Sequence, residues 1–221
     1  MRDVKKLIKE SWSAIFLAGL LMFAGAWLGY QYSHVFDKHI AAMMDQLKDI
    51  VEHIEGKDSP LYTAWYIFQN NTKAAMMMVI LGIFFFFAPG FTLFANGLVI
   101  GYVLHTSANA GVAPLAVILY GLMPHGILEL PVIIVAGGLG MFLGWRLLRW
   151  FWGSEGFFAH AFGEKRNVGV RTLWEERGKQ IFKERLHSVS ALLIIMICTL
   201  FVAAMIESFV TPLIIEKMIR S

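Results

Sequence analysis

The sequence feature that most constrains the fold is a long stretch with almost no charge. Between Ala74 and Trp145 the only formally charged side chain is Glu129. A helix in the core of a water-soluble domain cannot use so long an apolar run, whereas each helix that crosses a bilayer needs about 20 apolar residues. Composition agrees, since 16% of the residues are charged, against about 25% in soluble domains. The sequence therefore predicts an all-α membrane protein with several spans.

Five apolar segments have the length of a membrane span. We predict spanning helices at about 12–30, 62–88, 91–108, 125–145 and 188–210. The whole chain, 1–221, is then one transmembrane domain, a polytopic helical bundle. Bulky residues follow the first apolar segment, so we interpret it as an uncleaved anchor.

The charges outside these segments predict an orientation. Basic residues gather before the first span and in the segment at about 146–187, whereas the loop between the first two spans is acidic. Because basic segments stay in the cytoplasm, we predict a cell-membrane protein with a cytoplasmic N-terminus and an external C-terminus. The basic residues adjoin apolar segments rather than forming a patch on a soluble fold, so we expect no nucleic-acid partner.

Two segments between the spans have the apolar periodicity of amphipathic helices. The first, at about 37–55, lies in the predicted outside loop. Its apolar face either packs on the bundle or the bilayer, or docks a partner protein or a second protomer. The second, Val170–Leu186, lies in the cytoplasmic segment, and contact with lipid headgroups is its expected role.

The fourth apolar segment is too long for one straight span. As a helix, Ala113–Trp145 would extend about 50 Å, whereas the hydrocarbon core of a bilayer is about 30 Å thick. Pro124, Gly126 and Pro131 fall in its first half, so we predict a helix break near Pro124. Pro114–Leu122 then forms a short interfacial or re-entrant helix before the fourth span.

Small residues recur at a spacing of four in three of the predicted spans. Faces of this kind let helix backbones approach closely in lipid. We expect them to pack within one bundle, with homodimerisation as the alternative. The positions are Gly25 and Gly29, then Gly97 and Gly101, then Ala136, Gly140 and Gly144.

Polar side chains inside the predicted spans are candidates for a functional site. Most of them fall at one level near the outer leaflet, with Asn96 deeper. Because charges in a membrane are costly and seek partners, we expect Lys73 to be the counter-ion of Glu129 or Glu207. The cluster either locks the bundle or forms a proton or ion relay. Its members are Asn70, Asn71, Lys73, Asn96, His105, His125, Glu129 and Glu207.

His125 and Glu129 stand four residues apart and share one helical face. Together with His105 they are candidate metal ligands, and an intramembrane metalloenzyme is one alternative function. The spacing lacks the HExxH pattern of zinc proteases, and the sequence has no phosphate-binding motif. We therefore expect no catalytic residue and no cofactor.

An ordered set of motifs runs through the middle of the chain. It comprises Asn70-Asn71, Asn96-Gly97 with Gly101, PHGILELP at Pro124–Pro131, Ala136-Gly137, Gly140 and Gly144. This set, over about Asn70–Gly144, resembles the stage II sporulation protein M family, and PHGILELP is its most specific part. The resemblance implies family signature positions of unknown role at Asn71, Asn96, Gly97, His125, Gly126 and Glu129.

The resemblance implies a multi-pass plasma-membrane protein without established catalytic activity. The family's namesake is a membrane scaffold in the engulfment machinery of sporulating bacteria, where it recruits two peptidoglycan hydrolases, stage II sporulation proteins D and P. We therefore expect a non-enzymatic scaffold whose partners are the lipid bilayer and other membrane or envelope proteins, such as peptidoglycan hydrolases. The alternative is a transporter or channel component, because a broken helix beside a buried His/Glu/Lys cluster is typical of a transport site.

Overall fold

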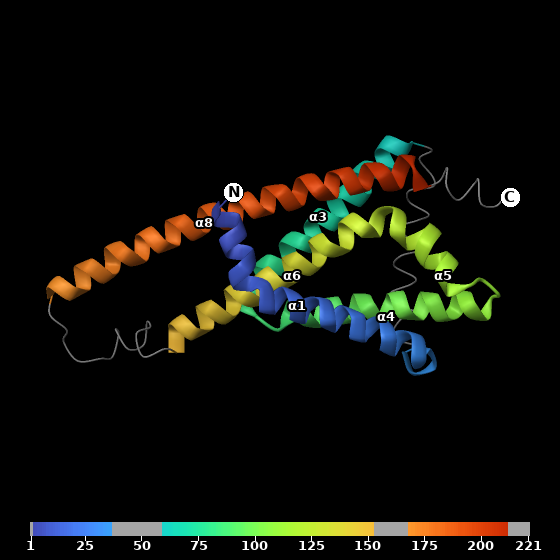
Figure 1. Ribbon diagram of the computed structural model, residues 1–221, viewed down its shortest axis with the longest axis horizontal. Helices are drawn as coiled ribbons and strands as arrows, with labels where there is room; N and C mark the ends of the chain where they lie inside the picture. Colours follow the sequence, from blue (N-terminus) through green and yellow to red (C-terminus); the bar gives the residue numbers. More distant parts are fainter. Residues whose placement is uncertain (1, 37–58, 153–167, 212–221) are drawn as a thin grey trace.

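The chain folds into long helices that lie against one another (Figure 1). The computed structural model describes residues 2–36, 59–152 and 168–211, without the side chains at 2, 121, 124, 125, 150–152 and 168–185. Helix is the only regular structure within these ranges, which confirms the predicted all-α class. The elements are α1 (Arg2–Gln31), α3 (Pro60–Phe84), α4 (Ala88–Asn109), α5 (Pro114–Ala116), the π-helix η1 (Val117–Leu122), α6 (Met123–Trp152) and α8 (Val168–Phe209).

Local sequence explains where several helices begin. Ser59 caps α3, because its side-chain oxygen accepts a backbone N–H of the first turn at 3.4 Å. Pro60 occupies that first turn, where its missing N–H leaves no hydrogen bond unmade, and Pro89 and Pro114 do the same in α4 and α5. Between α4 and α5, Gly111 has a φ of +85°, a conformation that suits glycine.

Four helices contain segments long and apolar enough to cross a membrane. These segments are Asp3–Gln31, Ala88–Asn109, Gly126–Arg149 and Leu186–Phe209. The chain is therefore a multi-pass membrane protein, as predicted. α3 is not among the four, because Gln69, Asn70, Asn71 and Lys73 interrupt its apolar residues. The predicted count of five spans is thus not confirmed.

The helices reverse direction from one long element to the next (Figure 1). α1, α4 and α8 run one way along the bundle, and α3 and α6 run the other way. Helices that share a direction are paired, so that α1 lies along α4 and α3 lies along α6.

The α1–α4 seam is a close approach of two backbones. A Cβ atom added at Gly25 would overlap the Phe94 carbonyl group, and one at Gly97 would overlap the Met22 carbonyl oxygen. Only glycine allows this contact, which explains the repeated small residues as packing inside one chain. The seam contains Gly25 and Gly29 of α1 and Gly97 and Gly101 of α4.

The α3–α6 seam uses glycine in the same way. A Cβ at Gly140 would overlap the Met78 carbonyl group, and one at Gly144 would overlap the carbonyl group of Gly82. Gly140 and Gly144 thus lie where two backbones approach closely. In both seams the glycines contact helices of the same chain; the alternative, homodimerisation, stays untested.

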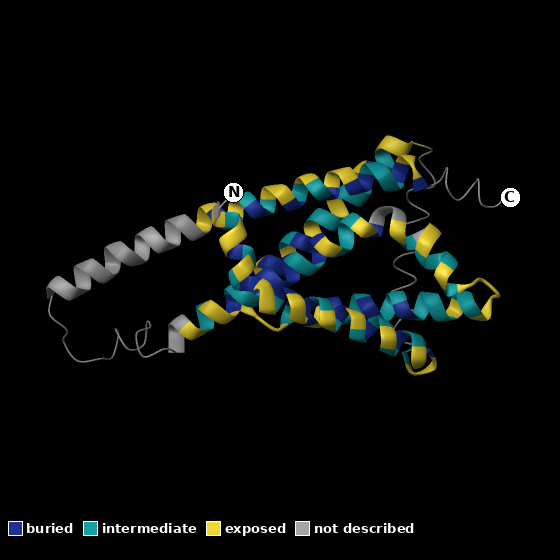
Figure 2. Ribbon diagram, in the orientation of Figure 1, coloured by how far each residue is buried: buried dark blue, intermediate teal, exposed yellow. Residues whose placement is uncertain are grey.

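The core lies where the paired helices cross. Leu93 of α4, Leu139 of α6 and Leu200 of α8 are completely inaccessible to solvent. Figure 2 shows the buried residues concentrated in this central region, with exposed residues on the outward faces. Many exposed residues are large and apolar, such as Phe16 and Phe23 of α1, as expected where helices face lipid rather than water.

The short interfacial or re-entrant helix predicted at Pro114–Leu122 is not confirmed; the structure has a change of helix type there. The short α5 passes into η1, where the Met123 N–H donates to the Ile118 carbonyl oxygen five residues back. The path of the ribbon turns between α5 and α6 (Figure 1). Pro124 falls in the first turn of α6, where a missing N–H is tolerated. Pro131 lies inside α6 without ending it.

Two predicted segments between the spans have different outcomes. The amphipathic segment at 37–55 lies outside the described residues, as does 153–167 of the cytoplasmic segment. α8 joins the predicted basic helix Val170–Leu186 to the last span in one helix of 42 residues, about 63 Å long. Because this length is twice the hydrocarbon core of about 30 Å, α8 extends well beyond the bilayer.

Candidate functional site

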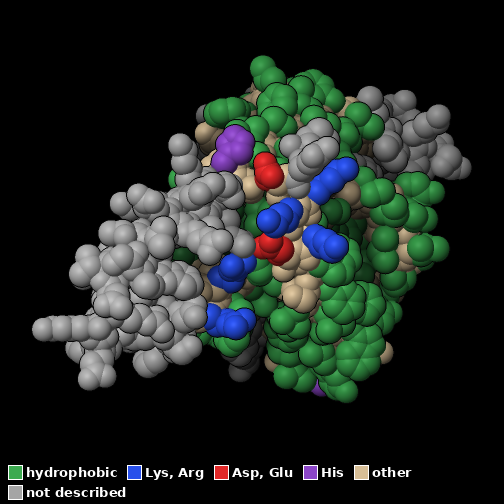
Figure 3. Space-filling view, turned by 60° about the vertical axis from the view of Figure 1, so that its left-hand side comes forward, with side chains coloured by type: hydrophobic (Ala, Val, Ile, Leu, Met, Phe, Trp, Pro, Cys, Tyr) green, Lys and Arg blue, Asp and Glu red, His purple; other side chains and the backbone are tan. Residues whose placement is uncertain are grey.

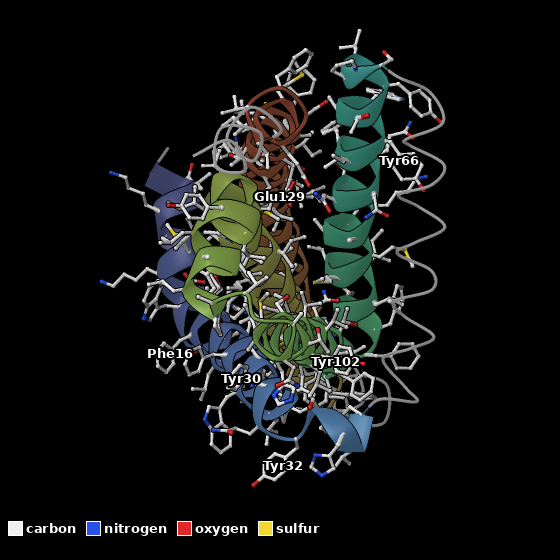
Figure 4. The ribbon with its side chains drawn as sticks, turned by 90° about the vertical axis from the view of Figure 1, so that its right-hand side faces the viewer. Phe16, Tyr30, Tyr32, Tyr66, Tyr102 and Glu129 are labelled. Atoms are coloured by element: carbon white, nitrogen blue, oxygen red, sulfur yellow. The ribbon has the colours of Figure 1, made fainter. Side chains whose placement is uncertain are left out.

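A polar contact joins the middle of α3 to the second turn of α6. The Asn71 side-chain amide, Nδ2, donates a hydrogen bond to Oε1 of Glu129 at 2.6 Å. Both side chains are half-buried, and Figure 4 shows Glu129 between the ribbons of α6 and α3. The parallel course of the two helices, set by the glycines deeper in the seam, brings these side chains together.

A third helix contributes to the same region. Glu207 of α8 lies close enough to Glu129 for electrostatic repulsion between the two carboxylates. Its neighbour Ser208 is buried and donates a hydrogen bond to the Pro60 carbonyl oxygen at the start of α3. We call Asn71, Glu129 and Glu207 the carboxylate cluster. The cluster brings two carboxyl groups within electrostatic range of each other, and its members come from three helices.

The structure separates other predicted members from this cluster. Lys73 is exposed, and the partner of Glu129 among the described residues is the Asn71 amide; a counter-ion role of Lys73 toward Glu207 stays a prediction. Lys73 stands two residues after Asn71, a rotation of about 200° around the helix, which turns it to the outer face of α3. Asn70, one residue before Asn71 and rotated by about 100°, is also exposed, and Asn96 is half-buried on α4 beside the glycine seam.

The predicted metal ligands are divided between two places. The His105 ring of α4 packs edge-on against Tyr30 of α1, with ring centroids 5.6 Å apart. Glu129 lies in the carboxylate cluster, and the His125 side chain lies outside the described residues. No group of three potential metal-ligating side chains occurs among the side chains that the structure describes.

Charge gathers at the opposite end of the bundle, which we call the basic end. Arg146 of α6 pairs with Glu10 of α1 at 3.3 Å and lies over the Phe142 ring at 5.4 Å from its centroid. Figure 3 shows Lys and Arg side chains together on this face, with acidic side chains between them. The basic residues described here are Lys5, Lys6, Lys9, Arg146 and Arg149.

Sequence reasoning missed three structural residues. The Ser208 hydroxyl donates a hydrogen bond to the first residue of α3, a role that its apolar sequence context does not indicate. Gly138 meets the backbone of Ile15 where α6 crosses α1, and Gly82 meets Gly140. A search for glycine anywhere in the apolar segments, rather than for pairs at a spacing of four, would have found the last two.

Comparison with known proteins supplies one match. Residues 13–212 match the family described as Stage II sporulation protein M. This match covers most of the chain, including α1 and α8, which the motifs between Asn70 and Gly144 did not reach. No match was found among curated proteins or among solved structures.

Proposed function

Because the chain belongs to the stage II sporulation protein M family, we propose that it is a non-enzymatic membrane scaffold that assembles with peptidoglycan-remodelling proteins. A scaffold needs a rigid frame and surfaces for partners, with no requirement for an open polar path through the bundle. The residues of this chain favour such a frame.

The observation that carries the proposal is the use of polar groups as ties between helices. Asn71 bonds to Glu129 between α3 and α6, and Ser208 bonds to Pro60 between α8 and α3. Interhelical hydrogen bonds of this kind stabilise helix association in lipid. Together with the two glycine seams, these bonds support a bundle of fixed shape.

In the proposed topology α3 crosses the membrane in addition to the four candidate spans, which makes five spans in all, and the basic end is cytoplasmic. α3 packs against α6 and α8, and its Gly82 is in backbone contact with α6, as expected for a helix inside the bundle. Basic residues favour the cytoplasmic side, which places the N-terminus inside and the carboxylate cluster near the outer leaflet. The segment at 37–55 is then external and offers a docking surface to envelope partners.

Cysteine labelling tests this topology. Cys198 is the only cysteine, so Cys198→Ser gives a background in which Asp3→Cys and Ser59→Cys are introduced singly. A membrane-impermeant maleimide should label Ser59→Cys in intact cells and Asp3→Cys only after the membrane is opened. Labelling of both sites in intact cells, or of Asp3→Cys alone, would contradict the proposed orientation.

Co-purification tests the scaffold role. The full chain is co-expressed with a peptidoglycan hydrolase of the same organism, extracted in mild detergent and captured through a tag on the chain. We expect the hydrolase to be recovered, and the double reversal Lys38→Glu with Lys48→Glu in the external segment to abolish recovery. The control is Lys73→Glu, an exposed reversal on α3. Equal recovery with the double variant and the control would argue against docking on the external segment.

Flux measurement distinguishes the scaffold from a transporter. The observation that favours transport is the proximity of Glu129 and Glu207, two carboxyl groups on neighbouring helices. The chain is reconstituted in liposomes, and uptake of protons and monovalent cations is followed with and without Glu129→Gln. The scaffold proposal expects no flux above that of empty liposomes. Flux that disappears in Glu129→Gln would replace it with the transporter function.

A further inference from the structure

An apolar groove opens between α1, the α3–α4 turn and α6, near the basic end. Its volume is about 460 Å³, within the range of about 300–1,000 Å³ for ligand pockets. Every described side chain in its lining is apolar. The lining includes Leu17, Leu21, Phe86, Gly90, Phe91 and Met141. We call it the α1–α6 groove.

Gly90 keeps this groove open. A Cβ atom added there would lie 2.9 Å from Cδ1 of Leu21 and 3.5 Å from the Met141 sulfur. These neighbours are the ends of flexible side chains, unlike the backbone atoms that face the glycines of the two seams. Helix packing therefore does not demand glycine at this position, and its absence of a side chain preserves the space between α1 and α6.

The basic end adjoins the groove. Phe86, in the lining, contacts the Trp145 ring with centroids 5.7 Å apart. The next residue, Arg146, pairs with Glu10, and Glu10 stands two helical turns before Leu17 on the same side of α1. The charged groups thus lie directly beyond the apolar lining, at the level where an aromatic ring marks the membrane interface.

The charge next to the groove is predominantly basic. Lys5, Lys6, Lys9 and Arg149 are all exposed around the Arg146–Glu10 pair. The acidic side chains that the structure describes at this end are Asp3 and Glu10. A negatively charged group located above the groove would therefore meet an excess of positive charge.

A second groove has a similar volume, so groove size alone does not indicate which molecule binds. It has a volume of about 480 Å³ and a mainly apolar lining between α3 and α8, which includes Trp65, Phe201 and Met205 beside Ser59 and Tyr62. The nearest charged side chain along α8 is Glu207, two residues after Met205. Only the α1–α6 groove combines an apolar lining with a basic rim among the described residues.

We infer that the α1–α6 groove and its basic rim bind an anionic glycerophospholipid. An acyl chain occupies the groove over Gly90, and the phosphate headgroup contacts Lys5, Lys6, Lys9 and Arg149. Long basic side chains extend to the headgroup level while their apolar stems cover the helix surface. This site lies far along the bundle from the carboxylate cluster and does not depend on the scaffold role.

Lipid retention measured by native mass spectrometry tests the inference. The full chain is purified, delipidated and incubated with equal amounts of phosphatidylglycerol and phosphatidylcholine that carry identical acyl chains. Wild type should retain phosphatidylglycerol preferentially. The triple variant Lys6→Gln, Lys9→Gln, Arg149→Gln should lose this preference. Each charge removed should lower the ratio of retained phosphatidylglycerol to phosphatidylcholine by about fivefold. Gly90→Leu should fill the groove and reduce retention of both lipids.

Matched variants separate these effects from damage to the fold. Lys73→Gln removes an exposed charge far from the groove, and Leu61→Trp adds bulk to the second groove; both should retain lipid as wild type does. Gly90→Ala should bind lipid more weakly than wild type but more strongly than Gly90→Leu. Thermal unfolding identifies any variant that fails to fold, and the triple variant, confined to exposed side chains, then provides the test. Equal retention of the two lipids by wild type would overturn the inference. Unchanged lipid retention by a folded Gly90→Leu variant would also overturn it. That result is expected if the groove binds a partner's transmembrane helix instead of lipid.

Discussion

The α1–α4 and α3–α6 seams join parallel helices, yet they are held in different ways. Along α1–α4, four glycines place one backbone against the other. Along α3–α6, glycines allow the same close backbone approach near Gly82 and Gly140. Farther along this seam, a hydrogen bond from Asn71 to Glu129 joins the two helices. The first seam depends on the absence of side chains, and the second adds a polar group that is costly in lipid unless it is paired. This difference indicates that α1–α4 serves packing, whereas α3–α6 carries the candidate site.

The largest effect is expected in the α1–α4 seam. Gly97→Ala should destabilise the bundle by about 1–3 kcal/mol, because the new methyl group overlaps backbone atoms that cannot rotate away. Gly97→Leu should prevent recovery of a monodisperse folded protein. Thermal unfolding in detergent, followed by intrinsic tryptophan fluorescence, measures the first, and size-exclusion chromatography measures the second.

Gly19→Ala is the control for that prediction. A Cβ at Gly19 meets only the Ile134 side chain, at 3.6 Å, which is ordinary van der Waals contact. Its unfolding temperature should stay near that of wild type. If both alanine variants were equally stable, the seam would not depend on close backbone approach.

An intermediate effect is expected at the polar end of α3–α6. Asn71→Leu should cost about 1–3 kcal/mol, because it leaves a half-buried carboxyl group without its donor. Glu129→Gln, which keeps an acceptor oxygen, should cost less than about 1 kcal/mol, in line with interhelical hydrogen bonds in membranes. Denaturant titration of the reconstituted protein compares the two variants.

Asn70→Leu separates the hydrogen bond from the general effect of removing an amide. Asn70 is exposed on α3, so its replacement should leave stability unchanged or slightly raised. Equal losses in Asn70→Leu and Asn71→Leu would show that the contact with Glu129 contributes nothing specific.

The smallest effect is expected at the basic end, outside both seams. Arg146→Gln removes an ion pair with Glu10 whose side chains are 46% and 30% exposed. Ion pairs this exposed contribute about 0–1 kcal/mol to stability, so the unfolding temperature of the variant should fall only slightly. The decrease should be smaller at high salt, which screens the pair. A loss as large as that of Gly97→Ala would mean that Arg146 has a structural role beyond this pair.

Much of the candidate site could be predicted, but not its internal arrangement. Glu129 was identifiable because a lone carboxyl group in an apolar stretch must have a partner. Which partner it has could not be predicted, because Asn70, Asn71 and Lys73 lie on the same turn or two of one helix. Each residue advances the helix by about 100°, so the choice among them depends on how α3 is rotated against α6. That rotation turns Asn71 inward and leaves Lys73 exposed.

The change of helix type before α6 was also only partly predictable from sequence. Pro124 and Gly126 indicated an interruption, and Pro114 indicated where the preceding helix begins. The interruption is a π-helix over Val117–Leu122 that leads directly into α6. Proline marks where a regular helix is weakened, whereas the hydrogen-bond pattern adopted there depends on the packing of the neighbouring turns.

The sequence by itself determined the membrane class, the positions of the long helices, the glycine faces and the family. Lipid imposes the membrane class and the long helices locally, because every spanning segment must be apolar and must satisfy its own backbone hydrogen bonds. Only the tertiary structure decided that Gly25 meets Phe94, that Gly82 meets Gly140, and that Asn71 is the hydrogen-bond partner of Glu129. Those contacts depend on the rotation and crossing of helices far apart in the chain, which no local pattern encodes.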